Sequence, residues 1–587
     1  QTLRLAAEGG PAAQDAILML KSSGPRGPVA HARVEYFQGD ASLGVAYTSE
    51  KGVVRSKLAA GDYSLQISAI GHGELNHEIT VEEGQIRADN LNLERASRIR
   101  AKIVDESGLP IPAKVQFIGI EGTKSPDYGP TSAIYAVRNA VYTANGKFEQ
   151  PIDPGKYRVI VSHGPEYDAD FREIEVTAGK LVQLSATLPR VVDTTGWISS
   201  EFHSHSTPSG DNVSHQTGRV LNLLAEHLEF APCTEHNRID TYSDDLELLG
   251  ATRWMATCTG MELTGGPLPI NHQNAFPLEM HTHEQDGGGP QVDSNPVKQI
   301  ERLALWDNSA SKVVQANHPD IPAILGDRDV NGQPDDGFRA MLGWMDIIEI
   351  HPPQFIFDVP KKDLAPKDRR NRMFYWLQLL NLGYRIPGVV NTDAHYNFHG
   401  SGWLRNYMES PTDLPYEIKV SDMIHSAEHG HMVMTSGPFL EAEIRKAVGT
   451  KLARYNVGED IDYSPGDILW IRVQCPNWFD INRVQVFANG RPLPKLNFTR
   501  KANPKLFTED VVRFETQFLV PDFKEDTHLI VATIGEGLTL GPVMGTENGA
   551  RPPVAVTNPF FLDVDGGGFK GNGDDLGIPF LLDVPEE

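Results

Sequence analysis

Short runs in which apolar and polar residues alternate fill the chain up to about residue 192. Residues 32–36 and 63–67 are examples, and turn pairs such as Gly-Asp and Glu-Gly separate such runs. Side chains of a strand point alternately to its two faces, so this period of two indicates strands with one buried face. Short strands between frequent turns predict antiparallel sandwiches.

The alternating pattern repeats once. Residues 61–65 (GDYSL) are echoed at 155–159 (GKYRV), a spacing of about 95 residues that matches one sandwich per repeat. We therefore predict two β-sandwich domains, residues 1–95 and 96–192.

The pattern changes after residue 193, where apolar residues at helical spacing alternate with short apolar runs. Such alternation predicts a β/α barrel or a doubly wound sheet in residues 193–440. Beyond residue 440 strand patterns return and predict a third sandwich, with a tail, over 441–587. The helical stretches are 217–228, 297–306, 338–344 and 373–382.

Polar residues suited to metal binding stand at the ends of the apolar runs in 193–440. In barrels and open α/β sheets, the carboxyl ends of the strands are where sites are built. This region also holds 15 of the 20 histidines. The residues that follow the runs are His203, His205, Asp211, His236, Glu262, His318, His351, Asp393 and His395.

A His-x-His pair begins this series. On a strand, His203 and His205 would point the same way and could bind one ion. Pairs at 281/283 and 429/431 have the same spacing, and about 0.7 such pairs are expected by chance, so the spacing alone is a weak signal. We interpret those two pairs, together with His425, as surface groups or neighbours of the site.

Charge and cysteine content narrow the chemistry. A net charge of −25 argues against nucleic acid or anionic lipid as a partner. Since no run approaches about 18 apolar residues, no transmembrane segment is expected. Cys233, Cys258 and Cys475 are too few for a disulfide scaffold or a cysteine-rich zinc site, and Cys233 and Cys258 are expected to be buried free thiols. Any metal must be held by imidazoles and carboxylates, which suit Zn, Mn or Fe(II).

The chain starts at Gln1 without a basic and apolar leader. This start favours an exported protein whose signal segment has been removed, with a trimmed chain as the alternative. The expected location is periplasmic or extracellular.

The ordered series of motifs resembles a known family. HxH, Asp, Thr-Glu-His, Gly-x-Glu, Asn-His-Pro, His and Asp-Ala-His resemble the polymerase-and-histidinol-phosphatase (PHP) superfamily of metal-dependent hydrolases. Residues 271–272, 276–278, 392–395 and 402–407 look most like its CehA/McbA branch, which includes carbamate ester hydrolases. The two N-terminal domains resemble carboxypeptidase-regulatory sandwiches, which act as spacers or bind sugars.

The resemblance implies a multidomain protein in which β-sandwiches flank a distorted (β/α)7 barrel. It also implies two or three divalent ions. Asp211 follows an extra glycine, Gly210, which departs from the family's pattern. The implied ligands are His203, His205, Glu262 and Asp393 for the first ion, Glu262, His318 and His351 for the second, and Asp211, His236 and His395 for the third.

These residues predict a hydrolase. Two ions bridged by Glu262 would make hydroxide available at neutral pH, and Asp393 could accept and return the proton. We assign Arg405 and His272 to the substrate, with Tyr407 behind them. The expected substrate is a small-molecule or glycan-linked phosphoester, or a carboxylic or carbamic ester. The alternative is an exported carbohydrate- or ligand-binding protein whose metal-binding barrel is catalytically silent. Oligomeric state is left open.

Two acidic loops have a calcium-like spacing. Residues 327–332 place oxygen ligands at alternate positions, but Phe338 stands where an EF-hand has its bidentate glutamate. Residues 563–568 match less well. Ordinary Asp/Gly turns are the favoured interpretation of both loops, and calcium is the alternative.

Overall fold

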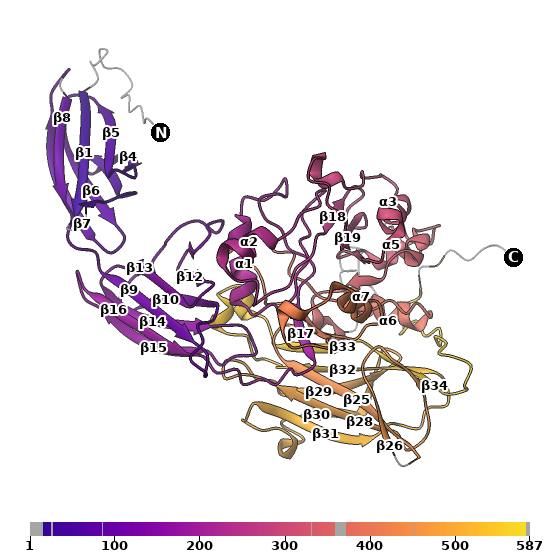
Figure 1. Cartoon of the computed structure of the whole chain (residues 1–587). Helices are drawn as coiled ribbons and strands as arrows, with labels where there is room; N and C mark the ends of the chain where they lie inside the picture. The colour runs from indigo at the N-terminus through magenta and orange to yellow at the C-terminus, as the bar shows by residue number, and fades with distance from the viewer. Residues whose placement is uncertain are drawn as a thin grey trace.

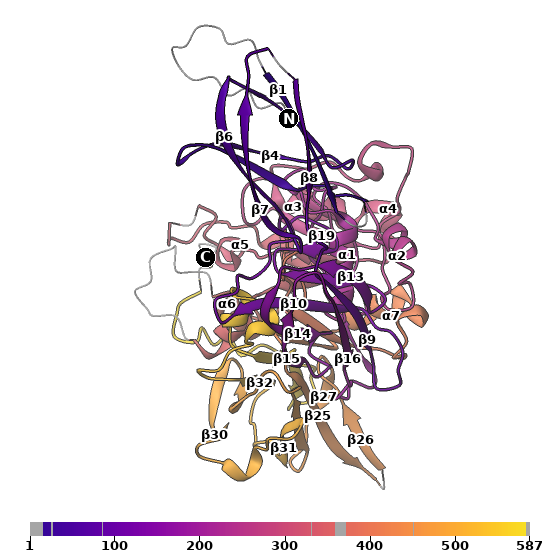
Figure 2. The ribbon, with the colours of Figure 1, turned by 90° about the vertical axis from the view of Figure 1, so that its left-hand side faces the viewer.

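A computed structural model describes residues 16–24, 27–84, 86–329, 331–358, 371–449, 451–580 and 582. Strands make up 37% of the structure and helices 15%. Figure 2 shows the N-terminal sandwich at one end of the molecule and the C-terminal sheets at the other, with the central region between them. No helix in the described ranges is long and apolar enough to cross a membrane.

The N-terminal part contains two four-stranded sheets that share one core (Figure 1). Strand β6 illustrates the cause, because Tyr63, Leu65 and Ile67 are buried while the residues between them are more exposed. Its sheet consists of β4 (Ala41–Tyr47), β3 (Arg33–Gln38), β6 (Gly61–Ala69) and β7 (Gly73–Val81). The other consists of β2 (Gly27–Pro28), β1 (Ala16–Gly24), β5 (Val53–Leu58) and β8 (Ile86–Asn92).

A second pair of sheets follows, around a core that includes Ile99, Phe117 and Val159. One sheet consists of β11 (Ala136–Val137), β12 (Ala140–Thr143), β10 (Ala113–Ile120), β14 (Gly155–Ser162) and β15 (Asp170–Val176). The other consists of β13 (Lys147–Pro151), β9 (Arg98–Val104) and β16 (Leu181–Thr187).

The C-terminal part also has two sheets, and their facing residues, such as Ile471 and Val486, form one core. The smaller consists of β26 (Lys451–Tyr455), β25 (Phe439–Val448), β28 (Ile468–Gln474) and β31 (Val512–Leu519). The larger has nine strands: β17 (Trp197–Ser200), β23 (Arg405–Glu409), β24 (Met432–Thr435), β33 (Val554–Thr557), β32 (Thr527–Ile534), β29 (Arg483–Ala488), β30 (Arg491–Thr499), β34 (Phe560–Asp563) and β27 (Asp460–Asp462). The larger sheet therefore takes strands from both sides of residue 440.

The central region has its own five-stranded sheet, in the order β18 (Met261–Thr264), β19 (His272–Phe276), β20 (Val313–Ala316), β21 (Ile347–Glu349) and β22 (Gly388–Val389). Helix α3 shows how its helices begin, since Asn295 accepts N–H bonds from the first turn and Pro296 occupies the first position. The helices are α1 (Gln216–Ala225), α2 (Ser243–Leu249), α3 (Pro296–Ala304), α4 (Trp306–Ser309), α5 (Ile321–Leu325), α6 (Arg372–Asn381) and α7 (Val420–Glu428).

The prediction of a fold organised on a (β/α)7 barrel is wrong. In the central sheet only β20–β21 and β21–β22 are parallel, while β18, β19 and β20 pair antiparallel. Strand β17 belongs to the nine-stranded sheet, and the apolar runs at 228–233 and 254–259 form only isolated bridges. The stretch at 338–344 is a short 3-10 helix. A seven-residue connection between β18 and β19 is too short for a crossover, so these strands form a hairpin.

Candidate metal centre

The loop after β17 carries the first two histidines and is held against residues 393–394. The Asp393 N–H donates to the His203 carbonyl and the His205 N–H donates to the Ala394 carbonyl, each at 3.0 Å. This parallel pairing turns both imidazoles into the same space, where their ring centroids lie 5.0 Å apart. The strand-like geometry expected for the His-x-His pair is present although β17 itself ends at Ser200.

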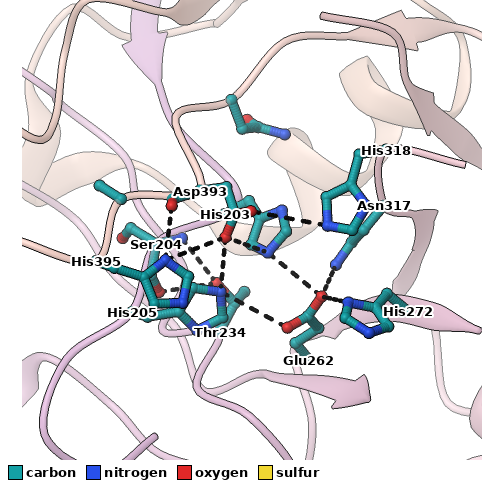
Figure 3. Close-up of polar contacts among 12 residues, drawn as sticks. His203, Ser204, His205, Thr234, Glu262, His272, Asn317, His318, Asp393 and His395 are labelled. Atoms are coloured by element: carbon teal, nitrogen blue, oxygen red, sulfur yellow. Dashed lines mark hydrogen bonds and ion pairs between the residues drawn. The ribbon is translucent and has the colours of Figure 1, made fainter. Parts of the chain in front are cut away.

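Glu262 on β18 lies at the centre of the cluster (Figure 3). Its side chain is fully buried, with Oε1 3.4 Å from His203 Nε2 and Oε2 3.6 Å from His205 Nε2. Burial opposes ionisation, but His203 and the hydrogen bonds to histidines outweigh it and hold the pKa of Glu262 well below its usual range. Glu262 is therefore a buried carboxylate ion.

Three further side chains surround the same carboxylate. His236 Nδ1 lies 2.5 Å from Oε2, while His272 Nδ1 lies 3.1 Å from Oε1. The Asn317 amide donates to Oε1 at 2.8 Å. Glu262 is thus positioned from both sides, as a carboxylate shared by two ions requires.

Asp393 faces Glu262 across the two histidines (Figure 3). Its Oδ1 lies 3.4 Å from His203 Nε2 and 3.1 Å from His205 Nε2, and its Oδ2 lies 3.8 Å from His318 Nε2. Burial raises the pKa of Asp393, but the neighbouring histidines, His203 first, depress it far more strongly. The side chain is 32% exposed, so it is the carboxylate of this pair that solvent reaches.

A third group lies on the outer side of His205. Asp211 Oδ2 is 3.3 Å from His236 Nε2 and 3.4 Å from His395 Nε2. The rings of His236 and His395 lie 4.0 Å and 4.5 Å from that of His205. The extra Gly210 does not prevent Asp211 from reaching this group.

The donor atoms fit divalent cations. Nε2 of His203 and of His205 are buried without a hydrogen-bond partner. Among the described residues, no lysine or arginine forms an ion pair with Glu262, Asp393 or Asp211. The groups whose donor atoms lie within 4.8 Å of one another include His203, His205 and Asp393; His203, Glu262 and His318; and His205, His236 and His395.

Protonation of the two central imidazoles follows from their surroundings. Burial lowers the pKa of His205 to about 4, which leaves its ring neutral at pH 7. Burial also acts on His203, but Asp393, Glu349 and Glu262 together raise its pKa well above the usual value. One proton on His203 offsets only one of these three carboxylate charges.

Glu349 is a functional residue that the sequence analysis missed. Its Oε1 lies 3.2 Å from His203 Nδ1 and accepts a hydrogen bond from the side-chain amide of Asn391 at 3.0 Å. Its Oε2 accepts a hydrogen bond from the backbone N–H of His318 at 2.9 Å. Burial opposes its charge, yet His203 and His351 lower its pKa to about 2. A carboxylate on Nδ1 orients the ring so that Nε2 faces the site. The available signal was a glutamate inside the apolar run 347–350.

Glu235 has a similar supporting role. It accepts from the Ser206 N–H at 2.8 Å and from the Ser209 hydroxyl at 2.5 Å, and Ser209 Oγ lies 3.1 Å from His205 Nδ1. Glu235 therefore holds the loop that carries His205 in place.

Three assigned residues lie differently from the expectation. Arg405 is fully buried and donates to the carbonyls of Gly402 and Glu226 at 2.7 Å and 2.8 Å. Tyr407 is buried with its ring 4.8 Å from that of Phe439. Neither has a contact with the cluster. His351 contacts Glu349 at 3.8 Å instead of Glu262.

The acidic loops satisfy their oxygens internally. Asp327 accepts the N–H groups of Asn331 and Gly332 at 2.9 Å and 3.0 Å. Asp563 accepts those of Gly566 and Gly568 at 2.7 Å and 2.8 Å. Such bonds are typical of Asp/Gly turns.

Cys233 and Cys258 are free and buried, as predicted, and so is Cys475.

No family model matches the chain, and no curated protein matches it. Among solved structures it is similar to the Bacillus anthracis TIE protein, at 16% identity over 34% of this chain and 37% of that one, with a TM-score of 0.15. It is also similar to a streptococcal ancillary pilin, at 11% identity over 31% and 64%, with a TM-score of 0.20. The shaft pilin SpaA of Lactobacillus rhamnosus GG is 10% identical over 30% of this chain and 99% of that one, with a TM-score of 0.18. The chain thus spans less than two thirds of the first two proteins.

Proposed function

We propose that the protein is a metal-dependent hydrolase that cleaves an ester. One observation carries the proposal: two ionised carboxylates, Glu262 and Asp393, face the same unpartnered imidazole nitrogens without a lysine or arginine to balance them. Burying such charge is costly unless a cation compensates it.

The chain's residues divide between holding ions and handling the substrate. His203, His205, His318, His236 and His395 would hold two or three divalent ions with Glu262, Asp393 and Asp211, and Glu262 would bridge two of them. Zn, Mn and Fe(II) suit this mixture of nitrogen and oxygen donors. Bound ions there would supply an activated water and polarise the ester oxygen.

Asp393 is the proposed proton acceptor. It is the more exposed of the two central carboxylates, so a substrate can approach it. In its ionised form it would take a proton from water and return it to the leaving oxygen. His272, whose Nδ1 lies 3.1 Å from Glu262 Oε1, would contact the substrate beside Glu262.

The resemblance of the motifs suggests two classes of ester as substrate. The ligand series looks like that of PHP hydrolases in general, which suggests phosphoesters. Residues 271–278 and 402–407 look like the CehA/McbA branch, which suggests carboxylic or carbamic esters. Arg405 is committed to backbone carbonyls, so it does not decide between the two ester classes.

The test measures metal and activity in the same sample. Protein purified without chelator is analysed for Zn, Mn and Fe and assayed on aryl acetate, aryl carbamate and aryl phosphate. Glu262→Gln should lose metal and activity together, whereas Glu284→Gln, on the exposed surface, should keep both. If reconstituted protein binds no metal and stays inert, the proposal is wrong and a binding protein is the better interpretation.

A further inference from the structure

A second group of histidines lies on the surface, at the turn from α7 to β24. His425 and His429 are four residues apart at the end of the helix, so they share one face of it. Gly430, in the left-handed region with φ of 70°, reverses the chain and brings His431 beside them. The ring centroids lie 4.2 Å (425 to 429), 5.8 Å (425 to 431) and 5.8 Å (429 to 431) apart.

These separations suit three imidazoles on one ion. With metal–nitrogen bonds of roughly 2.1 Å, ring centroids around a tetrahedral ion would be about 5 Å apart. The rings of the central cluster show the same range, from 4.0 Å between His205 and His236 to 5.8 Å between His236 and His395.

Hydrogen bonds orient the surface rings. His429 Nδ1 donates to the carbonyl of His425 at 2.9 Å, which leaves its Nε2 as an acceptor. His431 Nδ1 lies 3.6 Å from Glu409 Oε2, and Asn456 donates to the other oxygen of Glu409 at 3.0 Å. Burial, with the neighbouring His429 and His425, lowers the pKa of His431 to about 4, so this ring is neutral.

The group is accessible and separate from the central cluster. His425 and His429 are exposed, while Met423, Ile424 and Ala427 on the inner face of α7 pack in the core with Phe202. His429 and His431 line a surface cavity of about 430 Å³, which is also lined by Glu428, Glu459 and Asp460 and by Arg385, the partner of Asp460. An ion could therefore enter without passing the central site.

We propose that His425, His429 and His431 form a second metal site, for a divalent transition-metal ion such as Zn²⁺, Ni²⁺ or Cu²⁺. Glu409 is the fourth ligand or holds the water that completes the shell. Three imidazoles favour these ions over Mg²⁺ and Ca²⁺, which require oxygen ligands. The site does not depend on the hydrolase proposal, because it shares no residue with the central cluster.

Titration of the full chain with Co²⁺ and Ni²⁺ tests this site. The central cluster is first loaded with metal, and binding is followed by calorimetry and by the visible absorption of Co²⁺. We expect one further equivalent, bound at least roughly tenfold more weakly in His429→Ala and in His425→Ala. Central metal content and ester hydrolysis should not change in either variant.

His283→Ala is the matched control, because it removes an exposed histidine from another His-x-His pair. It should bind the extra equivalent as the unaltered chain does. A second readout is modification of histidines by diethyl pyrocarbonate, from which Zn²⁺ should protect residues 425, 429 and 431. The proposal is overturned if no further equivalent binds, or if His429→Ala, with an unchanged circular dichroism spectrum, binds it equally well.

Discussion

The described residues include two buried clusters of histidine and carboxylate that differ in how their charge is balanced. Around Glu262 and Asp393 the partners are histidines and neutral groups. In the other cluster, His227 lies between Glu166 and Glu229, at 3.1 Å and 3.9 Å. There Arg190 donates to Glu166 Oε2 from Nε and Nη2 at 2.9 Å and 2.5 Å.

Both clusters have donor atoms close enough together for a metal ion. In the cluster around Glu166, however, Arg190 supplies a permanent positive charge, and the Ser199 N–H donates to Glu229 at 2.9 Å. This cluster ties the second sandwich to the central region, and we expect it to stay metal-free. The comparison teaches that, for buried carboxylates, distances between donor atoms do not separate a metal site from an ion-pair cluster, whereas an unbalanced buried charge favours a metal site.

The largest expected effect is on catalysis. Asp393→Asn removes the proposed proton acceptor and a ligand, so kcat/KM on the preferred ester should fall by about 10²–10⁴-fold. Asp211→Asn, at a side chain that is 56% exposed, should have a smaller effect. Equal effects of the two substitutions would remove the distinction between the centre and the edge of the cluster.

Next in size is a loss of stability without a loss of metal. Arg190→Met leaves Glu166 buried without its arginine partner, and the free energy of unfolding should fall by about 3 kcal/mol. Urea denaturation measures this change. Arg158→Met, which breaks an exposed pair with Glu173, is the control and should cost less than about 1 kcal/mol. A change in metal content in Arg190→Met would contradict the assignment of the clusters.

Metal removal should separate the clusters by thermal unfolding. An ion that binds only the folded state stabilises it by about 2.7 kcal/mol at a concentration of 100 times Kd, so chelation should lower Tm by several degrees. Adding Zn²⁺ or Mn²⁺ should restore it. In Glu262→Gln, chelation should no longer lower Tm, whereas in Glu229→Gln it should lower Tm as in the unaltered chain. The opposite result would mean that the cluster around Glu166, and not the one around Glu262, binds the metal.

A supporting carboxylate should have a smaller effect. Glu349→Gln keeps the shape of the side chain but weakens the orientation of His203, so metal affinity should fall by about 10–100-fold. Competition with a fluorescent chelator measures the affinity. Glu284→Gln serves as the surface control, and unchanged affinity in Glu349→Gln would show that the contact only supports the fold.

The smallest effect appears in acid. Burial raises the pKa of Glu166, but His227 and Arg190 outweigh it and hold that pKa below its usual range in the folded state. Its contribution is thus fully present above the unfolded pKa, near 4.5, and is lost as pH falls towards the folded value. Glu166→Gln should flatten the acid limb of stability against pH, while Glu173→Gln should not. Parallel curves would rule out this ion pair as a source of acid sensitivity.

Local patterns were sufficient for part of the fold. The period of two in residues such as Tyr63, Leu65 and Ile67 appears as the buried face of β6, because alternation along a strand needs only neighbouring residues. The direction in which strands pair is not local. Nothing in the runs at 261–264 and 312–315 indicates in which direction these strands pair. In the structure β18, β19 and β20 pair antiparallel, and the expected barrel is absent.

By itself the sequence determined which donors gather at the candidate site. His203 and Asp393 follow short strands, and Glu262 lies on one. The segments that carry them meet through parallel bridges between Ser204 and Ala394 and between His236 and Glu262. Only the tertiary structure decided what each polar side chain contacts. Arg405 turned to carbonyls, Glu349 turned to His203, and Arg190 neutralised Glu166 but no carboxylate of the central cluster. The physical reason is that the sequence specifies which residues carry charge. Which groups neutralise that charge depends on partners that folding brings from distant segments.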